Sequence, residues 1–172
     1  MLYTGKGDDG TTYFFGSKKR FGKDTPLVEA LGTCDELNSL LGLIRAQLQG
    51  PALKLELEQV QQDLFIIQAE LAGADKHIAE EKIKKMEERI GEIEKSLPPI
   101  KTFFIPGANK ESAWLDYART VARRCERRVV ALVPKAPALT LKYLNRLSSL
   151  LYALARAHAQ SGGEVEKAPD YK

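Results

Sequence analysis

Large apolar residues recur at a fixed spacing between positions 53 and 71, and this spacing constrains the fold more than any other feature of the chain. Steps of four and three residues alternate along the segment, which places the apolar side chains on one stripe of an α-helix. The stripe consists of Leu53, Leu57, Val60, Leu64, Ile67 and Leu71. Because such a stripe packs against other helices at a shallow angle, the segment predicts a helix bundle.

Four other segments have the same helical periodicity. They cover residues 25 to 49, 83 to 97, about 110 to 132 and about 139 to 161, and proline or glycine residues follow each of them. Thr25 is expected to cap the first of these helices, and Pro26 suits its first turn. The chain, residues 1–172, therefore predicts a single all-α domain. An ordered loop (residues 1–24) precedes an up-and-down five-helix bundle (residues 25–162), and a flexible tail (residues 163–172) follows it.

The composition excludes several classes of protein. The 172 residues are 44% hydrophobic and 28% charged, and the net charge of +3 is too small to indicate nucleic-acid binding. No apolar stretch is long enough to span a membrane, and the first ten residues do not resemble a secretory signal. Cys34 and Cys125 lie in helical patterns and are expected to be buried free thiols. These features predict a cytoplasmic protein.

The glycine-rich N-terminal segment has the composition of a phosphate-binding loop. Gly5 and Gly7 would let backbone amides approach an anion closely, and nearby side chains add hydrogen-bond donors. Those side chains are Thr4, Lys6, Thr11 and Thr12. The segment is not a Walker A loop, because two threonines stand where Lys followed by Ser or Thr is required. Composition alone favours a flexible or turn-rich N-terminus over a phosphate-binding loop.

A row of arginines in the fourth predicted helix is a stronger candidate. Arg119, Arg123 and Arg127 follow one another at steps of four residues and so share a helix face. Their guanidinium groups suit carboxylates or phosphates, and Glu126 could orient one of them. Arg124 and Arg128 flank the row. A solvated basic face or ion pairs between subunits would explain the same pattern.

Three further positions could complete a site. Asp35 interrupts the apolar stripe of the first helix and could pair with Arg119 or Arg123, unless it is simply an exposed acid. Asn145 could bind a ribose hydroxyl or a base edge, although a plain surface helix would look similar. Phe103, in the apolar segment before the fourth helix, could belong to a core plug or to a wall for a flat, bulky ligand.

In their order along the chain, these segments resemble the PduO-type cobalamin adenosyltransferases from Tyr3 to about Gly162. The matching segments are Tyr3–Thr4 with Gly7–Thr12, Lys23–Asp24, Val28–Asn38, Phe103–Gly107, Ala118–Arg119 with Arg123–Val130, and Tyr143–Ser148. The resemblance implies a homotrimer that binds ATP between the N-terminal loop of one subunit and the fourth helix of another. The implied ATP contacts are Thr4, Gly5, Lys6, Gly7, Thr11, Thr12, Lys23, Arg123, Arg124, Glu126, Arg127 and Asn145.

The resemblance also implies a reaction. Cobalt of cob(I)alamin would attack the 5′ carbon of ATP, and Arg123, Arg127 and Mg²⁺ would stabilise the departing triphosphate. Asp35 and Arg119 would form an ion pair at the subunit interface, and Phe103 would exclude the lower axial ligand of cobalt. No side chain is expected to ligate a metal. A reductase and an adenosylcobalamin-dependent enzyme would be the protein partners.

The loop departs from the family pattern, because the family's lysine is displaced by one position to Lys6. Two other functions use the same residues. A non-catalytic trimeric bundle could carry nucleotide or corrinoid to another enzyme, and a purely structural bundle could use the arginines in subunit contacts.

Overall fold

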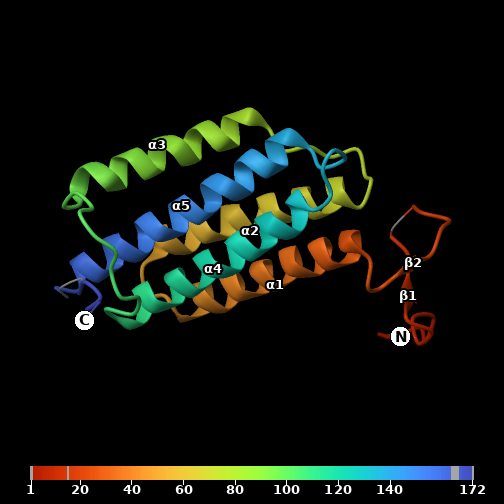
Figure 1. Ribbon diagram of the computed structural model, residues 1–172, viewed down its shortest axis with the longest axis horizontal. Coiled ribbons are helices and arrows are strands. Elements are labelled where there is room, and N and C mark those ends of the chain that lie inside the picture. The colour runs from red at the N-terminus through yellow and green to blue at the C-terminus, as the bar shows by residue number, and fades with distance from the viewer. Residues whose placement is uncertain (1, 15, 164–166, 172) are drawn as a thin grey trace.

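The computed structural model describes residues 2–14, 16–163 and 167–171, and these residues form five helices. The helices are α1 (Pro26–Gln47), α2 (Pro51–Leu71), α3 (Glu80–Ser96), α4 (Lys110–Val130) and α5 (Ala138–Ser161). They lie lengthwise beside one another (Figure 1). Helix α4 packs against both α1 and α5, while α2 packs on α1 and α3 on α5. The predicted five-helix bundle is therefore confirmed.

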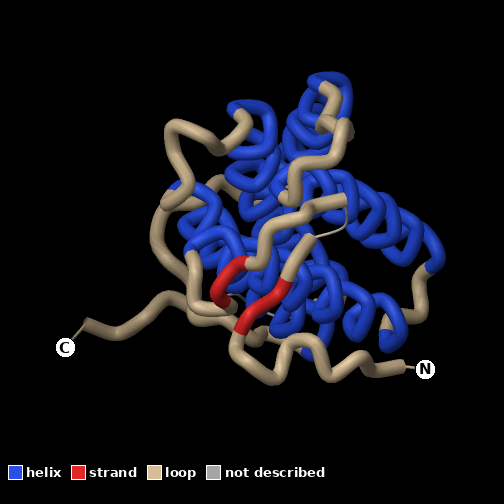
Figure 2. Tube along the Cα trace, turned by 90° about the vertical axis from the view of Figure 1, so that its right-hand side faces the viewer, coloured by secondary structure: helices blue, strands red, loops and turns tan. Residues whose placement is uncertain are grey.

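Two short strands precede the bundle. Strand β1 (Thr11–Thr12) pairs antiparallel with β2 (Phe21–Gly22), with Thr11 opposite Gly22. Figure 1 shows both strands beyond the end of the bundle at which α1 begins, and Figure 2 shows them in front of the helices when that end faces the viewer. The N-terminal segment is thus a small structure of its own at one end of the molecule.

The helix ends agree with the sequence signals except at one cap. Pro26 opens α1 as predicted, but the hydroxyl of Thr25 donates to the carbonyl of Gly22 at 2.9 Å and caps no amide of the helix. The predicted cap was wrong because the tight turn before α1 offers that hydroxyl a nearer acceptor. Helix α4 has a capping box instead, in which Asn109 and Ser112 each accept from the other's backbone amide.

The predicted apolar stripes form the core. In α2, five of the six stripe residues are buried, and Leu71 is partly buried. Cys34 of α1 and Cys125 of α4 are buried as predicted, and their sulfur atoms lie 2.9 Å apart. The sequence did not predict this contact. The hydrogen bond with Cys34, together with burial, raises the pKa of Cys125, so this residue is a neutral thiol at neutral pH.

A buried polar cluster joins three helices. Asp63 of α2 accepts hydrogen bonds from Lys82 of α3 and from the hydroxyl of Tyr143 of α5, the latter at 3.0 Å. Asp63 and Tyr143 are buried. Burial, with the charge of Asp63, raises the pKa of Tyr143 well above its ordinary value, so the hydroxyl remains a donor. The cluster connects α3 to the rest of the bundle.

Residues 97–109 connect α3 to α4 at the end of the bundle opposite the strands (Figure 1). The amide of Ile105 in this connector donates to the carbonyl of Lys167 at 2.8 Å. This part of the predicted flexible tail is therefore hydrogen-bonded to the connector, whereas residues 164–166 and 172 lie outside the described residues. None of the helices in the described part of the chain is long and apolar enough to cross a membrane.

Candidate functional site

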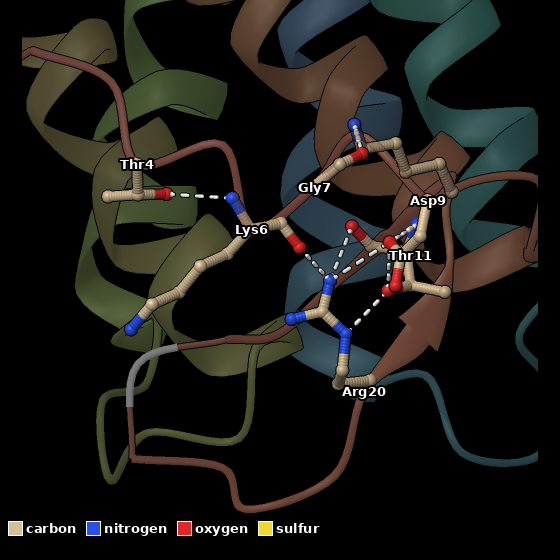
Figure 3. A network of polar contacts seen from close by, with 7 residues as sticks. Thr4, Lys6, Gly7, Asp9, Thr11 and Arg20 are labelled. Carbon is tan, nitrogen blue, oxygen red and sulfur yellow. Dashed lines mark hydrogen bonds and ion pairs between the residues drawn. The ribbon is translucent and has the colours of Figure 1, made fainter.

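Arg20 organises the N-terminal loop. Its guanidinium donates to the backbone carbonyl of Lys6, to the hydroxyl of Thr11 and, at 3.1 Å, to the carboxylate of Asp9 (Figure 3). Asp9 also accepts from the amide and the hydroxyl of Thr11, at 2.9 and 2.7 Å. These bonds from Thr11 lower the pKa of Asp9, so Asp9 is a carboxylate at neutral pH. These bonds therefore connect Lys6, Asp9 and Thr11 through Arg20.

The predicted loop residues are held differently from one another. The carbonyl of Lys6 faces Arg20, whereas its ammonium group points away from the cluster (Figure 3). The ammonium group of Lys23 donates to the carbonyl of Gly7 at 2.8 Å. A Cβ atom at Gly7 would lie only 3.1 Å from that nitrogen, so a side chain there would displace Lys23. Gly5 has a φ of +66°, which a glycine adopts without strain.

The five arginines of α4 divide into two groups by their partners. Arg124 pairs with Glu36 and Arg128 with Glu29, both on α1. Arg119 pairs with Asp116 at 2.9 Å and lies over the ring of Tyr152, 5.7 Å from its centre. Arg123 and Arg127 are exposed, and their side chains make no ion pair or hydrogen bond within the described residues. Two guanidinium groups of the row are thus available to an external anion.

Two sequence expectations about acids differ from the structure of the single chain. Glu126 accepts from the side-chain amide of Asn145 at 2.9 Å and does not orient Arg123. Asp35 is exposed and pairs with neither Arg119 nor Arg123, because Arg119 has Asp116 three residues before it on the same helix. The Asp35–Arg119 pair between subunits stays a prediction.

A cavity of about 590 Å³ lies between the connector and helices α4 and α5. One wall consists of residues 100–108, including Phe103, whose ring is largely exposed (78%). The other walls are formed by Ser112, Asp116, Arg119, Arg123, Ser148, Ser149, Tyr152, Ala155, Arg156 and Ala159. The cavity therefore combines an apolar wall with the guanidinium group of Arg123, which is unpaired among the described residues, and this combination suits a ligand that is both bulky and anionic.

The chain does not bring all predicted site residues together. Phe103, Arg119 and Arg123 line the cavity, but the N-terminal loop lies beyond the opposite end of the bundle from the connector (Figure 1). Thr4, Lys6, Thr11 and the other loop residues are therefore absent from its walls.

Sequence reasoning missed Arg20, Asp116 and Arg156. The spacing of Asp116 three residues before Arg119 was a usable signal for an ion pair. Arg20 ends a basic run, Lys18–Arg20, that has the appearance of a solvated segment. Arg156 lies within an apolar helical stripe, and nothing local indicates its partners.

Comparison with known proteins identifies the family. Residues 2–158 match the family described as cobalamin adenosyltransferase. The corrinoid adenosyltransferase of Bacillus subtilis is 42% identical, and the match covers 96% of this chain and 91% of that protein. Corrinoid adenosyltransferase PduO of Citrobacter freundii is 40% identical over 91% of this chain, but the match spans only 49% of that longer protein.

Solved structures agree with this assignment. A variant of the PduO-type ATP:corrinoid adenosyltransferase from Lactobacillus reuteri, complexed with cobalamin and ATP, superposes with a TM-score of 0.92 at 32% identity. That match covers 98% of this chain and 99% of the other. A second variant of the same enzyme, complexed with ATP, has a TM-score of 0.91. The family match over residues 2–158, together with this fold, shows that the chain belongs to the cobalamin adenosyltransferase family.

Proposed function

We propose that this protein transfers the 5′-deoxyadenosyl group of ATP to the cobalt of cob(I)alamin and releases triphosphate. The observation that carries the proposal is that exposed Phe103 and Arg123, whose side chain has no partner among the described residues, lie on the walls of one cavity. A site that joins a flat corrinoid to a nucleoside triphosphate requires an apolar surface close to a cationic one. The membership of the family supports the same reaction.

The protein contributes positioning and charge rather than a nucleophile. Reduced cobalt is itself the nucleophile, so the bond from cobalt to the 5′ carbon forms as the bond from that carbon to the triphosphate oxygen breaks. The leaving triphosphate gains charge in the transition state, and Arg123 and Arg127 would stabilise it. Their lack of partners within the described residues leaves their donors available for this role.

Mg²⁺ would arrive with ATP rather than occupy a protein cage. The described residues contain no group of three or more His, Cys, Asp or Glu side chains that could hold a metal ion. Phosphate oxygens are good ligands for Mg²⁺, and the ion commonly keeps most of its other ligands as water. The ion would neutralise part of the triphosphate charge that the arginines face.

Phe103 would act on the other substrate. Its exposed ring lies on the connector, where it would occupy the place of the lower axial ligand of cobalt. Removal of that ligand favours reduction of cob(II)alamin to cob(I)alamin. The apolar wall would therefore favour formation of the cob(I)alamin nucleophile, and the arginines would stabilise the leaving triphosphate.

The complete site would require a second copy of the chain. The N-terminal loop has phosphate-binding donors but lies at the opposite end of the bundle from the connector, which supports sites between subunits, as in the homotrimer that the family resemblance implies (Figure 1). In that assembly the loop residues and Lys23 of one subunit would contact ATP together with Arg123, Arg124, Arg127 and Asn145 of another. Asp35 of one subunit would pair with Arg119 of the next. A cytoplasmic location, a reductase and an adenosylcobalamin-dependent enzyme remain predictions.

The direct test is an anaerobic reaction of the purified protein with chemically reduced cob(I)alamin and Mg-ATP. We expect adenosylcobalamin and triphosphate to form in equal amounts over many turnovers, as measured by visible absorbance and by chromatography. Binding of ATP without either product would instead favour the cofactor carrier. An absence of ATP binding would favour the structural bundle.

A further inference from the structure

Arg156 is a buried arginine directly beneath the connector. The residue is only 5% exposed although it carries a charge. The carbon of its guanidinium lies 5.0 Å from the centre of the Phe104 ring, and one of its nitrogens donates to the carbonyl of Pro98 at 3.2 Å. A buried charge is costly unless its partners compensate for the lost water. The contacts with the connector are part of that compensation.

The two connector residues that Arg156 contacts bracket Phe103 in the chain. Residues 97–108 form no helix or strand. Phe103 itself has a largely exposed ring and no hydrogen bond or ring contact recorded within the described residues. Its position therefore depends on how its neighbours are held. Arg156 holds one residue on each side of it, and the bond from Ile105 to Lys167 adds a third attachment.

We infer that Arg156 is a positioning residue for Phe103. The inference rests on the proposed function, in which Phe103 excludes the lower axial ligand of cobalt. An exposed ring on an irregular segment can displace a ligand only if its backbone stays in place, because a displacement of about 1 Å can reduce a rate by orders of magnitude. Arg156 acts through Phe104 and Pro98.

The chemistry of the contacts requires arginine. A guanidinium is planar, so one face can stack on the Phe104 ring while an edge donates to the Pro98 carbonyl. Lysine would keep the positive charge but has a compact ammonium group that cannot make both contacts in this geometry. Arg156→Lys is therefore the informative variant, since it changes the geometry and preserves the charge.

The effect should depend on how the corrinoid is supplied. Phe103 favours reduction of cob(II)alamin, so a loosened connector should slow the reaction when cob(II)alamin is reduced in place by a reduced flavin. Cob(I)alamin that has been reduced beforehand no longer carries the lower ligand, so the loss of rate with that substrate should be smaller. The KM for ATP should change less than the flavin-coupled rate, because the inferred role acts through the connector.

The test compares the wild-type protein with Arg156→Lys, Phe104→Leu and a control, Arg89→Lys. Arg89 lies on α3 and pairs with Glu56, away from the cavity. Each protein is assayed with both forms of the corrinoid. The EPR spectrum of cob(II)alamin is also recorded with ATP present, because splitting by the axial nitrogen disappears when that ligand leaves. Circular dichroism checks that each variant is folded.

We expect Arg156→Lys to reduce the flavin-coupled rate by about tenfold. It should restore the nitrogen splitting, and it should change the KM for ATP and the rate with cob(I)alamin much less than the flavin-coupled rate. Phe104→Leu should shift the same measurements in the same direction, and Arg89→Lys should change none of them.

Wild-type spectra and rates in Arg156→Lys would overturn the inference. Equal losses with both corrinoid forms, accompanied by a raised KM for ATP, would also overturn it, because they indicate a general structural role. A wild-type protein that forms no adenosylcobalamin would contradict the proposed function itself, whatever the variants do.

Discussion

At the scale of single residues, neighbouring arginines of α4 differ in what they can bind. Arg124 and Arg128 are held by acids of α1, whereas the side chains of Arg123 and Arg127 make no ion pair or hydrogen bond in the described part of the chain. The spacing of four residues correctly predicts that Arg119, Arg123 and Arg127 follow one face. It cannot predict which arginines are paired, because that depends on the register between α1 and α4.

Arg20 should matter for ATP binding although the sequence did not single it out. Arg20→Gln removes the donors that join Asp9, Thr11 and the carbonyl of Lys6, so these parts of the loop should no longer be held together. We expect the KM for ATP to rise by about tenfold, with a smaller change in kcat. Steady-state kinetics with ATP varied measures this, and Lys19→Gln is the control. An unchanged KM in Arg20→Gln would show that the network is not needed for binding.

At the scale of helices, the apolar stripes predicted the elements and most of the core, because helical periodicity is a local property of the sequence. Long-range polar contacts were not predictable in this way. The cluster around Asp63 joins residues of α2, α3 and α5, and the connector is tied to Lys167 more than sixty positions later in the chain. Neither contact has a local signal.

The Asp63 cluster should contribute measurably to stability. Asp63→Ala leaves the buried hydroxyl of Tyr143 and the Lys82 ammonium without this acceptor, and we expect a loss of about 3 kcal/mol in the free energy of unfolding. Tyr143→Phe should cost about 1 kcal/mol, because it removes one hydrogen bond. Urea unfolding at fixed protein concentration measures both. Glu58→Gln, which breaks the surface pair with Arg45, should change stability by no more than about 0.5 kcal/mol.

His77 should make the turn after α2 sensitive to pH. Its ring lies 2.7 Å from the carboxylate of Glu70, and this hydrogen bond raises the pKa of His77 above its ordinary value. Because the pKa of His77 is raised in the folded state, the protonated ring stabilises the fold. This contribution is complete below the pKa of the unfolded state, about 6.5, and is lost as pH rises through the pKa of the folded state. The melting temperature of wild type should therefore exceed that of His77→Gln more at about pH 6 than at about pH 9. An equal difference at both pH values would contradict this linkage.

At the scale of the whole molecule, the loop and the connector lie at opposite ends of the bundle (Figure 1). Sequence reasoning identified both segments as functional candidates. The order of elements along the chain does not give their separation in space. The proposed trimer explains how both could serve one nucleotide.

Mixed assemblies test that proposal. A loop variant, Lys6→Ala with Lys23→Ala, and a helix variant, Arg123→Ala, should each be nearly inactive. If a site combines the loop of one subunit with α4 of another, each mixed trimer should have about a third of the wild-type activity, because about one in three of its interfaces carries neither change. Sites built within single subunits would give no recovery. The two variants are co-expressed with different affinity tags, and assemblies that carry both tags are purified. Their activity distinguishes sites between subunits from sites within one subunit.

The most direct measurement of the central claim is the turnover of Arg123→Ala in the anaerobic assay with cob(I)alamin and Mg-ATP, beside Arg128→Ala. The claim is that the guanidinium group of Arg123 on the cavity wall stabilises the leaving triphosphate. It predicts that Arg123→Ala lowers kcat/KM by about a hundredfold or more while the helix content is unchanged, and that Arg128→Ala, which loses only its pair with Glu29, has a much smaller effect. Near-normal turnover in a folded Arg123→Ala protein would contradict the account.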